Sequence, residues 1–211
     1  RVKELEKQVR QMEKLATIGE LAAGLAHEIK NPLAGIKGSL QLLQQGTMNA
    51  AYTEKLHGVI QRDIQRLDRL LSDFLDFARP AESHPKELRL DSAVHLVLET
   101  MKQEHPEISF SIQDSLLGKS WTWDPDHLHQ ILLNLLINAA QAAKHTDQGQ
   151  VSVGWSDNDS QRCIWIRDNG PGLQKDLETS LFDPFVTTKD KGTGLGLSIA
   201  QRLAGLNNSW I

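Results

Sequence analysis

The sequence predicts two domains: an all-α antiparallel helical hairpin that forms a dimeric four-helix bundle, followed by an α+β two-layer sandwich. Apolar residues recur every three or four positions through residues 1–78, which is typical of long amphipathic helices. After a Pro-containing segment, shorter helical patterns alternate with strand-like patterns, which favours an α+β domain. The expected order is a coiled-coil signalling helix at 1–14, the hairpin at 15–79, a linker at 80–87 and the sandwich at 88–211.

Charge and composition exclude several functions. The 211 residues include 23 basic and 27 acidic side chains and carry a net charge of −4, so there is no basic surface typical of nucleic-acid binding. The single cysteine, Cys163, excludes an internal disulfide, and its apolar neighbours indicate packing in a strand. No apolar run reaches the ~20 residues of a membrane span. We expect a cytoplasmic core, attached to a membrane only through segments absent from this chain.

Two offset apolar seams mark the first helix, which we expect to end near Gln45. The first seam comprises Val2, Leu5, Val9, Met12 and Ala16, and the second comprises Leu15, Ile18, Ala22, Leu25 and Ile29. Such an offset is a stutter, which changes local supercoiling. The pattern fits a helix that packs on a partner, and equally one that carries a signal towards residue 27.

A second helix is expected over 50–78, with its apolar stripe running from Leu56 to Phe77. Its charged residues, Arg66 among them, are interpreted as a mostly solvated surface. Two antiparallel helices cannot bury two wide apolar stripes against each other alone, so we predict a homodimer.

The second domain is expected to place helices on one face of a mixed sheet. The predicted helices cover 90–105, 124–145 and 198–203, and the predicted strands cover 108–112, 121–123, 150–155 and 162–167, with a polar turn at 156–160.

The segment L-A-H-E-I-K-N-P-L, residues 25–33, combines an imidazole, a carboxylate and a carboxamide. His27 and Asn31 are four residues apart and share one helix face. A neutral imidazole is a good nucleophile near neutral pH, and Glu28 can hold or receive its proton. Pro32 removes a helical hydrogen bond and can bend the helix.

Four further motifs indicate a nucleotide site. Asn134 and Asn138 place two amides on one helix face, a suitable arrangement for Mg²⁺ that also carries phosphates. The loop D-N-G-P-G at 168–172 offers Asp168 to an exocyclic amine. The segment F-D-P-F-V-T-T-K at 182–189 contains two aromatic anchors and Lys189. The loop G-T-G-L-G-L at 192–197 precedes a helix, where backbone N–H groups attract anions.

Together these motifs resemble the sensor histidine kinases of two-component systems over about residues 10–204. H-E-I-K-N-P-L looks like the family's H-box, and N-L-L-I-N-A, D-N-G-P-G, F-D-P-F and G-T-G-L-G-L look like its N, G1, F and G2 boxes. The resemblance implies the histidine-kinase/Hsp90-like ATPase fold for the second domain. The short segment between the F and G2 boxes is similar to the ATP lid of nitrogen-regulation-type kinases.

The resemblance also implies a role for each matching residue. His27 would accept the phosphoryl group, Glu28 would assist as acid or base, and Asn31 would orient water when the domain dephosphorylates its regulator. ATP would be held by Asn134, Asn138, Asp168, Gly170, Gly172, Lys189, Thr193, Gly194, Leu195 and Gly196, and Asn138 would also coordinate Mg²⁺. The implied partners are a second copy of the chain and a response regulator receiver domain, with a protein inhibitor of the bundle as a further candidate.

Two other readings remain open at this point. One is a dimeric scaffold that binds nucleotide but transfers nothing, and the other is an ATPase of the chaperone or mismatch-repair type. The family normally continues past the G2 helix with another strand hairpin, which this sequence lacks, so the sheet is expected to be incomplete. The other histidines have no companions at ligand spacing, which argues against a zinc site.

Overall fold

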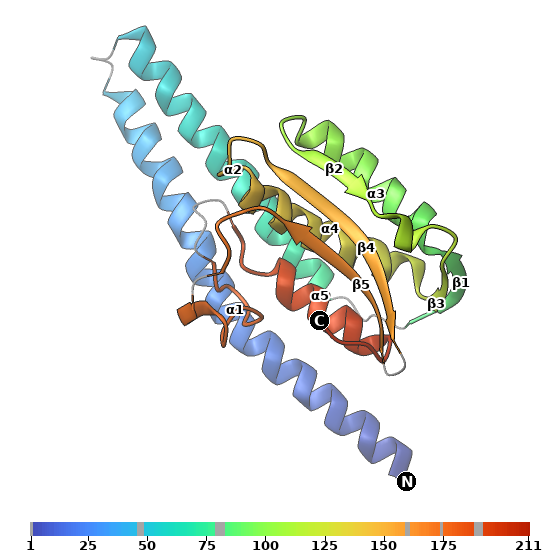
Figure 1. Cartoon of the computed structure of the whole chain (residues 1–211). Helices are drawn as coiled ribbons and strands as arrows, with labels where there is room; N and C mark the ends of the chain where they lie inside the picture. Colours follow the sequence, from blue (N-terminus) through green and yellow to red (C-terminus); the bar gives the residue numbers. More distant parts are fainter. Residues whose placement is uncertain (1, 46–48, 79–82, 159–160, 174, 188–191) are drawn as a thin grey trace. The chain divides into compact units, whose positions relative to one another are not determined.

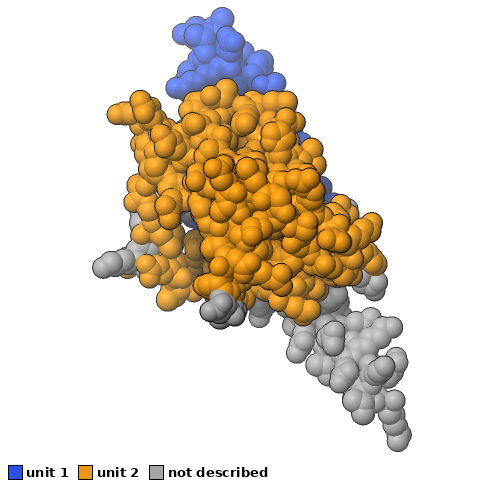
Figure 2. All heavy atoms as spheres, turned by 45° about the vertical axis from the view of Figure 1, so that its right-hand side comes forward, with its two compact units in different colours: residues 1–79, 184–195 blue, residues 80–183, 196–211 orange. Residues whose placement is uncertain are grey.

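A computed structural model of the chain describes residues 2–45, 49–78, 83–158, 161–173, 175–187 and 192–211. The chain divides into two compact units (Figure 2), one formed by residues 1–79 with 184–195 and the other by residues 80–183 with 196–211. Across the described part of the chain, no helix combines the length and the apolar character that a membrane crossing requires.

The first unit is built on the predicted helical hairpin. Helix α1 spans Val2–Gln44 and helix α2 spans Ala50–Ala78, and the two pack along each other (Figure 1). The side chain of Asn49 accepts a hydrogen bond of 2.9 Å from the N–H of Tyr52, which caps the start of α2. Helix α1 continues through Pro32, whose side chain is buried. The helical hairpin is confirmed, with ends within one residue of those expected.

The described residues of the second unit form three long helices, two short 3₁₀ turns and five strands. The helices are α3 (Leu90–Glu104), α4 (Pro125–Ala143) and α5 (Gly196–Leu206), and the turns are η1 (Asp114–Leu116) and η2 (Lys175–Leu177). The strands are β1 (Lys86–Arg89), β2 (Ser109–Ile112), β3 (Ser120–Trp123), β4 (Gln150–Asn158) and β5 (Gln161–Asp168).

A mixed three-stranded sheet forms the second layer of this unit. Strand β4 lies in the middle, parallel to β2 and antiparallel to β5, while β1 and β3 pair separately as an antiparallel ribbon. Helix α4 packs on β4 and β5, and α3 packs on β2, α4 and β1, so the helices cover one face of the sheet (Figure 1). Leu132 and Leu136 of α4 and Val151 and Val153 of β4 are almost completely buried between these layers.

The structure differs from the sequence prediction at three places. Strand β1 begins at Lys86, inside the segment 80–87 that was expected to be a linker, because its backbone pairs with β3. Strand β4 continues to Asn158, so residues 156–158 are strand and not part of the expected turn at 156–160, whose last two residues lie outside the described part. The segment 184–195 groups with the helical hairpin, although it was expected within the domain 88–211.

Asp124 organises the start of α4 and holds the end of the linker. Its carboxylate accepts N–H hydrogen bonds from Asp126 and His127 in the first turn, and a third, of 2.6 Å, from the N–H of His84. Asn207, just after α5, donates to Nδ1 of His127 and accepts from the hydroxyl of Ser83. This partly buried network fixes residues 83 and 84 to the second unit.

We expect Asp124→Ala to lower the free energy of unfolding of the second unit by about 1–2 kcal/mol, the usual cost of losing a helix N-cap. Burial of Asp124 raises its pKa, but the N–H groups of His84 and His127 outweigh this effect and hold the pKa below the ordinary value of 3.8. The stabilisation is therefore present above about pH 3.8 and is lost as the pH falls through the lowered pKa. Urea unfolding of the variant and the wild type between pH 7 and pH 2.5 measures both effects. A destabilisation that persists unchanged at the lowest pH would contradict the assignment.

Candidate functional site

The predicted phosphoacceptor lies on an open face of α1. The side chain of His27 is 76% exposed, and its Nδ1 lies 4.0 Å from Oε1 of Glu28. Asn31 is also exposed, while Pro32 and Leu25 point into the hairpin and are buried. The exposure of both His27 and Asn31 agrees with the prediction that they share one helix face. An exposed imidazole with a carboxylate 4.0 Å from Nδ1 leaves its other nitrogen, Nε2, available to an electrophile.

Arg66 on α2 occupies the second oxygen of the Glu28 carboxylate. Its Nη2 donates to Oε2 of Glu28 at 2.9 Å, and both side chains are about three-quarters buried, with exposed fractions of 25% and 24%. The interpretation of Arg66 as part of a solvated surface is wrong, because the helical repeat turns this residue towards α1. The sequence pattern did not reveal this partner, since the pair is separated by 38 residues.

The two predicted amide ligands lie on α4 in the second unit. Nδ2 of Asn134 is buried and has no hydrogen-bond partner among the described residues. A Cβ atom placed on Gly196, the first residue of α5, would lie 3.6 Å from Oδ1 of Asn134. The structure thus brings the end of the glycine-rich loop next to Asn134. An unsatisfied buried amide costs about 1–3 kcal/mol, so a ligand that accepts its hydrogen bond fits this position.

The D-N-G-P-G loop begins at the carboxyl end of β5, as predicted. Oδ1 of Asp168 accepts the N–H of Gly170 at 2.8 Å. A Cβ atom on Gly170 would come within 2.8 Å of the backbone of Ala142 in α4, so only glycine allows this close approach. Gly172 has a left-handed φ of 81°, which also favours glycine. Asp168 is exposed at the loop, where a ligand can reach its carboxylate.

Asn169 has a structural role that the sequence analysis missed. Its Oδ1 accepts the N–H of Gln150 at 2.8 Å, and its Nδ2 donates to the carbonyl of Gln148 at 2.7 Å. These bonds tie the end of β5 to the segment between α4 and β4. They hold the neighbouring Asp168 and Gly170 in place. The sequence signal for this role was the residue type, because an asparagine in a glycine-containing loop commonly bonds to nearby backbone groups.

The predicted lid residues fall into two groups. Lys189 lies outside the described residues, whereas Thr193, Gly194 and Leu195 belong to the unit of the helical hairpin. The hydroxyl of Thr193 donates to Oδ2 of Asp73 in α2 at 2.6 Å. These contacts do not test whether the three residues bind nucleotide, so that role stays a prediction.

Phe185 anchors the same segment. Its N–H donates to the carbonyl of Gly194 at 3.0 Å, and a Cβ atom on Gly24 of α1 would lie 2.7 Å from its ring. Gly194 has a φ of 68° and lies against the backbone of Phe185, which leaves no room for a side chain. Phe185 thus packs against α1. The sequence analysis interpreted Phe182 and Phe185 as loop anchors but did not predict the surface on which Phe185 packs.

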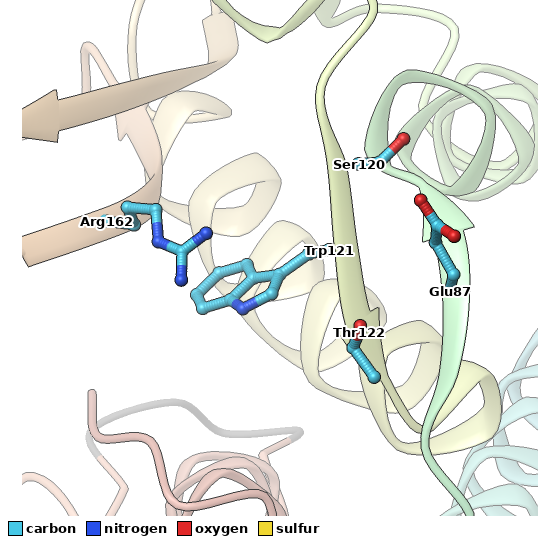
Figure 3. Close-up of a pocket in the computed structure, with 5 residues that line it drawn as sticks. All are labelled: Glu87, Ser120, Trp121, Thr122 and Arg162. Atoms are coloured by element: carbon cyan, nitrogen blue, oxygen red, sulfur yellow. The ribbon is translucent and has the colours of Figure 1, made fainter.

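A shallow pocket of about 220 Å³ lies elsewhere in the second unit (Figure 3). It is lined by Glu87, Ser120, Trp121, Thr122 and Arg162, and the guanidinium of Arg162 lies 5.9 Å from the centre of the Trp121 ring. None of the predicted site residues lines it. Arg162 and Asp168 are at opposite ends of β5, about 20 Å apart at the usual rise of a strand. The pocket is therefore separate from the predicted nucleotide loop.

Comparison with known families supplies the decisive observation. Residues 17–83 match the family described as "His Kinase A (phospho-acceptor) domain", and residues 123–211 match "Histidine kinase-, DNA gyrase B-, and HSP90-like ATPase". The chain belongs to the sensor histidine kinase family. It combines this family's phosphoacceptor domain, which contains His27, with its ATP-binding domain.

The chain is similar in sequence to individual sensor histidine kinases. The chain is 39% identical to "Signal transduction histidine-protein kinase AtoS" of Escherichia coli over 95% of its own length and 33% of that protein. It is 34% identical to "Sensory histidine kinase/phosphatase NtrB" of Vibrio alginolyticus over 90% of its own length and 57% of that protein. The chain thus spans about a third to somewhat over half of these relatives.

A solved structure agrees in fold over almost the whole chain. The histidine kinase ThkA, solved in complex with the response regulator protein TrrA, gives a TM-score of 0.77 at 23% identity and covers 98% of this chain and 60% of that chain. This similarity confirms the predicted fold, a helical hairpin followed by an α+β domain.

Proposed function

We propose that this kinase core uses ATP and Mg²⁺ to phosphorylate His27 and then transfers the phosphoryl group to an aspartate of a response regulator. The observation that carries the proposal is the presence of both family domains in one chain, with an exposed histidine inside the phosphoacceptor match. A chaperone-type or mismatch-repair-type ATPase has no use for a phosphoacceptor domain, so that reading is set aside.

The environment of His27 fits the role of a nucleophile. When Glu28 accepts the Nδ1–H, the lone pair of Nε2 faces outward and can attack the γ-phosphorus of ATP. The new bond joins Nε2 to phosphorus, and the bond from the γ-phosphorus to the bridging oxygen breaks, so ADP leaves with that electron pair. The imidazole becomes cationic in this step, and the Glu28 carboxylate beside Nδ1 stabilises that charge. Such a transfer depends mainly on positioning and charge neutralisation.

The proposed nucleotide contacts come largely from the second unit. Asp168 would accept a hydrogen bond from the adenine amine, and Gly170 and Gly172 would let the backbone approach the base. The buried Nδ2 of Asn134 would donate to a phosphate oxygen, and Gly196 would present the start of α5. Asn138 would hold Mg²⁺, and the bound ion would neutralise part of the phosphate charge. Lys189, Thr193, Gly194 and Leu195 would complete the site from the lid.

The regulator side of the proposal rests on relatives. ThkA was solved with a response regulator, and NtrB is named a kinase/phosphatase. Asn31, exposed one turn after His27, would orient the water that dephosphorylates the regulator. The cytoplasmic location, the membrane attachment outside this chain and a protein inhibitor of the bundle stay predictions.

We further propose that the kinase is a homodimer through its helical hairpin. Large apolar side chains of the hairpin are exposed in the single chain, with 52% at Leu71, 53% at Leu75 and 49% at Leu33. Exposed apolar side chains gathered on one hairpin favour burial against a second copy.

Replacing both Leu71 and Leu75 by Glu should raise the dimer dissociation constant at least about 100-fold, because two buried leucines contribute about 3 kcal/mol or more. Sedimentation equilibrium of the full chain measures the change. Leu96→Glu on α3, where the leucine is 61% exposed, is the matched control and should leave the dimer intact. A wild-type chain that sediments as a monomer would contradict the dimer.

Phosphoryl labelling tests the proposed activity. The chain is incubated with ATP labelled at the γ-phosphate, and we expect label on the protein that is lost in acid, kept in alkali and absent when a chelator removes Mg²⁺. Nucleotide binding without label would favour the non-catalytic scaffold. Steady ATP hydrolysis without label would favour a plain ATPase.

A further inference from the structure

The carboxylate of Glu28 lies between two side chains of the hairpin. Its Oε1 faces Nδ1 of His27 at 4.0 Å, and its Oε2 accepts the 2.9 Å hydrogen bond from Nη2 of Arg66. A glutamate on a helix has three rotatable bonds, and one hydrogen bond on Oε2 removes most of that freedom. With Oε2 held by the opposite helix, Oε1 remains turned towards the imidazole.

We propose that Arg66 is a positioning residue for phosphotransfer, which holds Glu28 so that His27 carries its proton on Nδ1 and keeps Nε2 as the nucleophile. The inference rests on the proposed role of His27. In this proposal Arg66 acts through Glu28, to which it donates its hydrogen bond.

The ion pair between Arg66 and Glu28 is not explained by a contribution to folding stability alone. A partly exposed pair contributes only about 0–1 kcal/mol, and Nε of Arg66 is buried with no hydrogen-bond partner among the described residues. An unsatisfied buried N–H costs about 1–3 kcal/mol. A purely structural arginine would be expected to bind the carboxylate through two N–H groups, or to turn its guanidinium to solvent. Retention of a geometry that leaves Nε unsatisfied fits a role in orienting Glu28.

Arg69 provides a matched control on the same helix. It lies three residues after Arg66, is exposed, and donates its Nε to the carbonyl of Gln65 in its own helix. It has the same charge and nearly the same place along α2, without the contact to α1. An effect of general charge or of α2 stability would appear at both positions, whereas the positioning role belongs to Arg66 alone.

The kinetic test compares Arg66→Met, Arg66→Lys and Arg69→Met in single-turnover labelling. We expect Arg66→Met to lower the rate at saturating ATP roughly 10- to 100-fold with less than about a twofold change in the ATP concentration at half-maximal rate. Arg66→Lys should restore part of the loss, and Arg69→Met should match the wild type. In a Glu28→Gln background, Arg66→Met should add less than about twofold, because the two residues act as one unit.

A spectroscopic test does not depend on kinase activity. Long-range ¹⁵N–¹H spectra of histidine-labelled chain, at about pH 8.5 where ordinary imidazoles are neutral, report which ring nitrogen carries the proton. The His27 signal is assigned by its loss in His27→Gln. We expect the Nδ1–H form in the wild type and in Arg69→Met, and a shift towards the Nε2–H form in Arg66→Met. Circular dichroism confirms that each variant is folded.

The outcomes separate the two proposals. If the wild type shows the Nδ1–H form and Arg66→Met loses it, the positioning role stands even where no label appears, and the absence of label overturns the proposed function alone. If folded Arg66→Met keeps the wild-type tautomer or the wild-type labelling rate, the role of Arg66 is overturned. If the double variant loses labelling rate by the product of the two single losses from Arg66→Met and Glu28→Gln, the role of Arg66 is overturned as well.

Discussion

Replacing His27 by glutamine is expected to reduce protein labelling by at least about 1,000-fold, because the carboxamide provides no lone pair that can attack phosphorus. The side chain is 76% exposed on α1 and carries no core contacts, so the fold should be unaffected. The substitution changes none of the residues proposed to hold nucleotide, so nucleotide should bind with the wild-type dissociation constant. Labelling with γ-phosphate and fluorescence titration with a nucleotide analogue measure the two quantities on the same preparation.

His57 is the matched control for this substitution. It is exposed on α2, in the same unit, and belongs to none of the motifs, so His57→Gln should label at the wild-type rate. Normal labelling of His27→Gln would show that another residue accepts the phosphoryl group. Loss of nucleotide binding in the same variant would show that the effect does not arise at the phosphoacceptor.

Gly170→Ala is expected to produce the second large effect, in the nucleotide site. The added methyl group would meet the backbone of Ala142 and Oδ1 of Asp168, each within 2.8 Å, so the loop must move away from α4. Overpacking of this kind costs about 1–3 kcal/mol. Because Asp168 moves with the loop, we expect at least a tenfold weaker affinity for nucleotide, about 1.4 kcal/mol. Isothermal titration and thermal unfolding measure the two changes.

The matched control is Gly205→Ala in α5. A Cβ atom there meets nothing within 4 Å, and alanine favours a helix over glycine by up to about 1 kcal/mol. The control should therefore be as stable as the wild type or more stable, with unchanged nucleotide affinity. A Gly170→Ala chain with wild-type affinity would mean that the D-N-G-P-G loop does not contribute to the nucleotide site.

Local sequence patterns were sufficient for the long elements and for the motif residues. The apolar stripe of residues 50–78 defined α2 to the residue, and the Asp124-Pro125 pair marked the start of α4, because helix periodicity and capping are local properties. The H-E-x-x-N spacing placed His27 and Asn31 on one exposed face for the same reason.

Features that depend on distant partners could not be predicted in this way. The four residues of β1 contain one apolar side chain, Leu88, and form a strand only because β3 supplies the hydrogen bonds. The contact between Thr193 and Asp73 joins residues 120 positions apart, and that between Arg66 and Glu28 spans 38. Each belongs to a segment that reads locally as polar surface, so only the folded chain shows the pairing.

The most direct measurement of the central claim is the location of the phosphoryl group by tandem mass spectrometry after incubation with ATP and Mg²⁺, with the peptides kept at alkaline pH. We predict a single modified position, His27, whose phosphate is lost after brief acid treatment. Phosphate on a serine, threonine or aspartate, or on another histidine such as His57, would contradict the account.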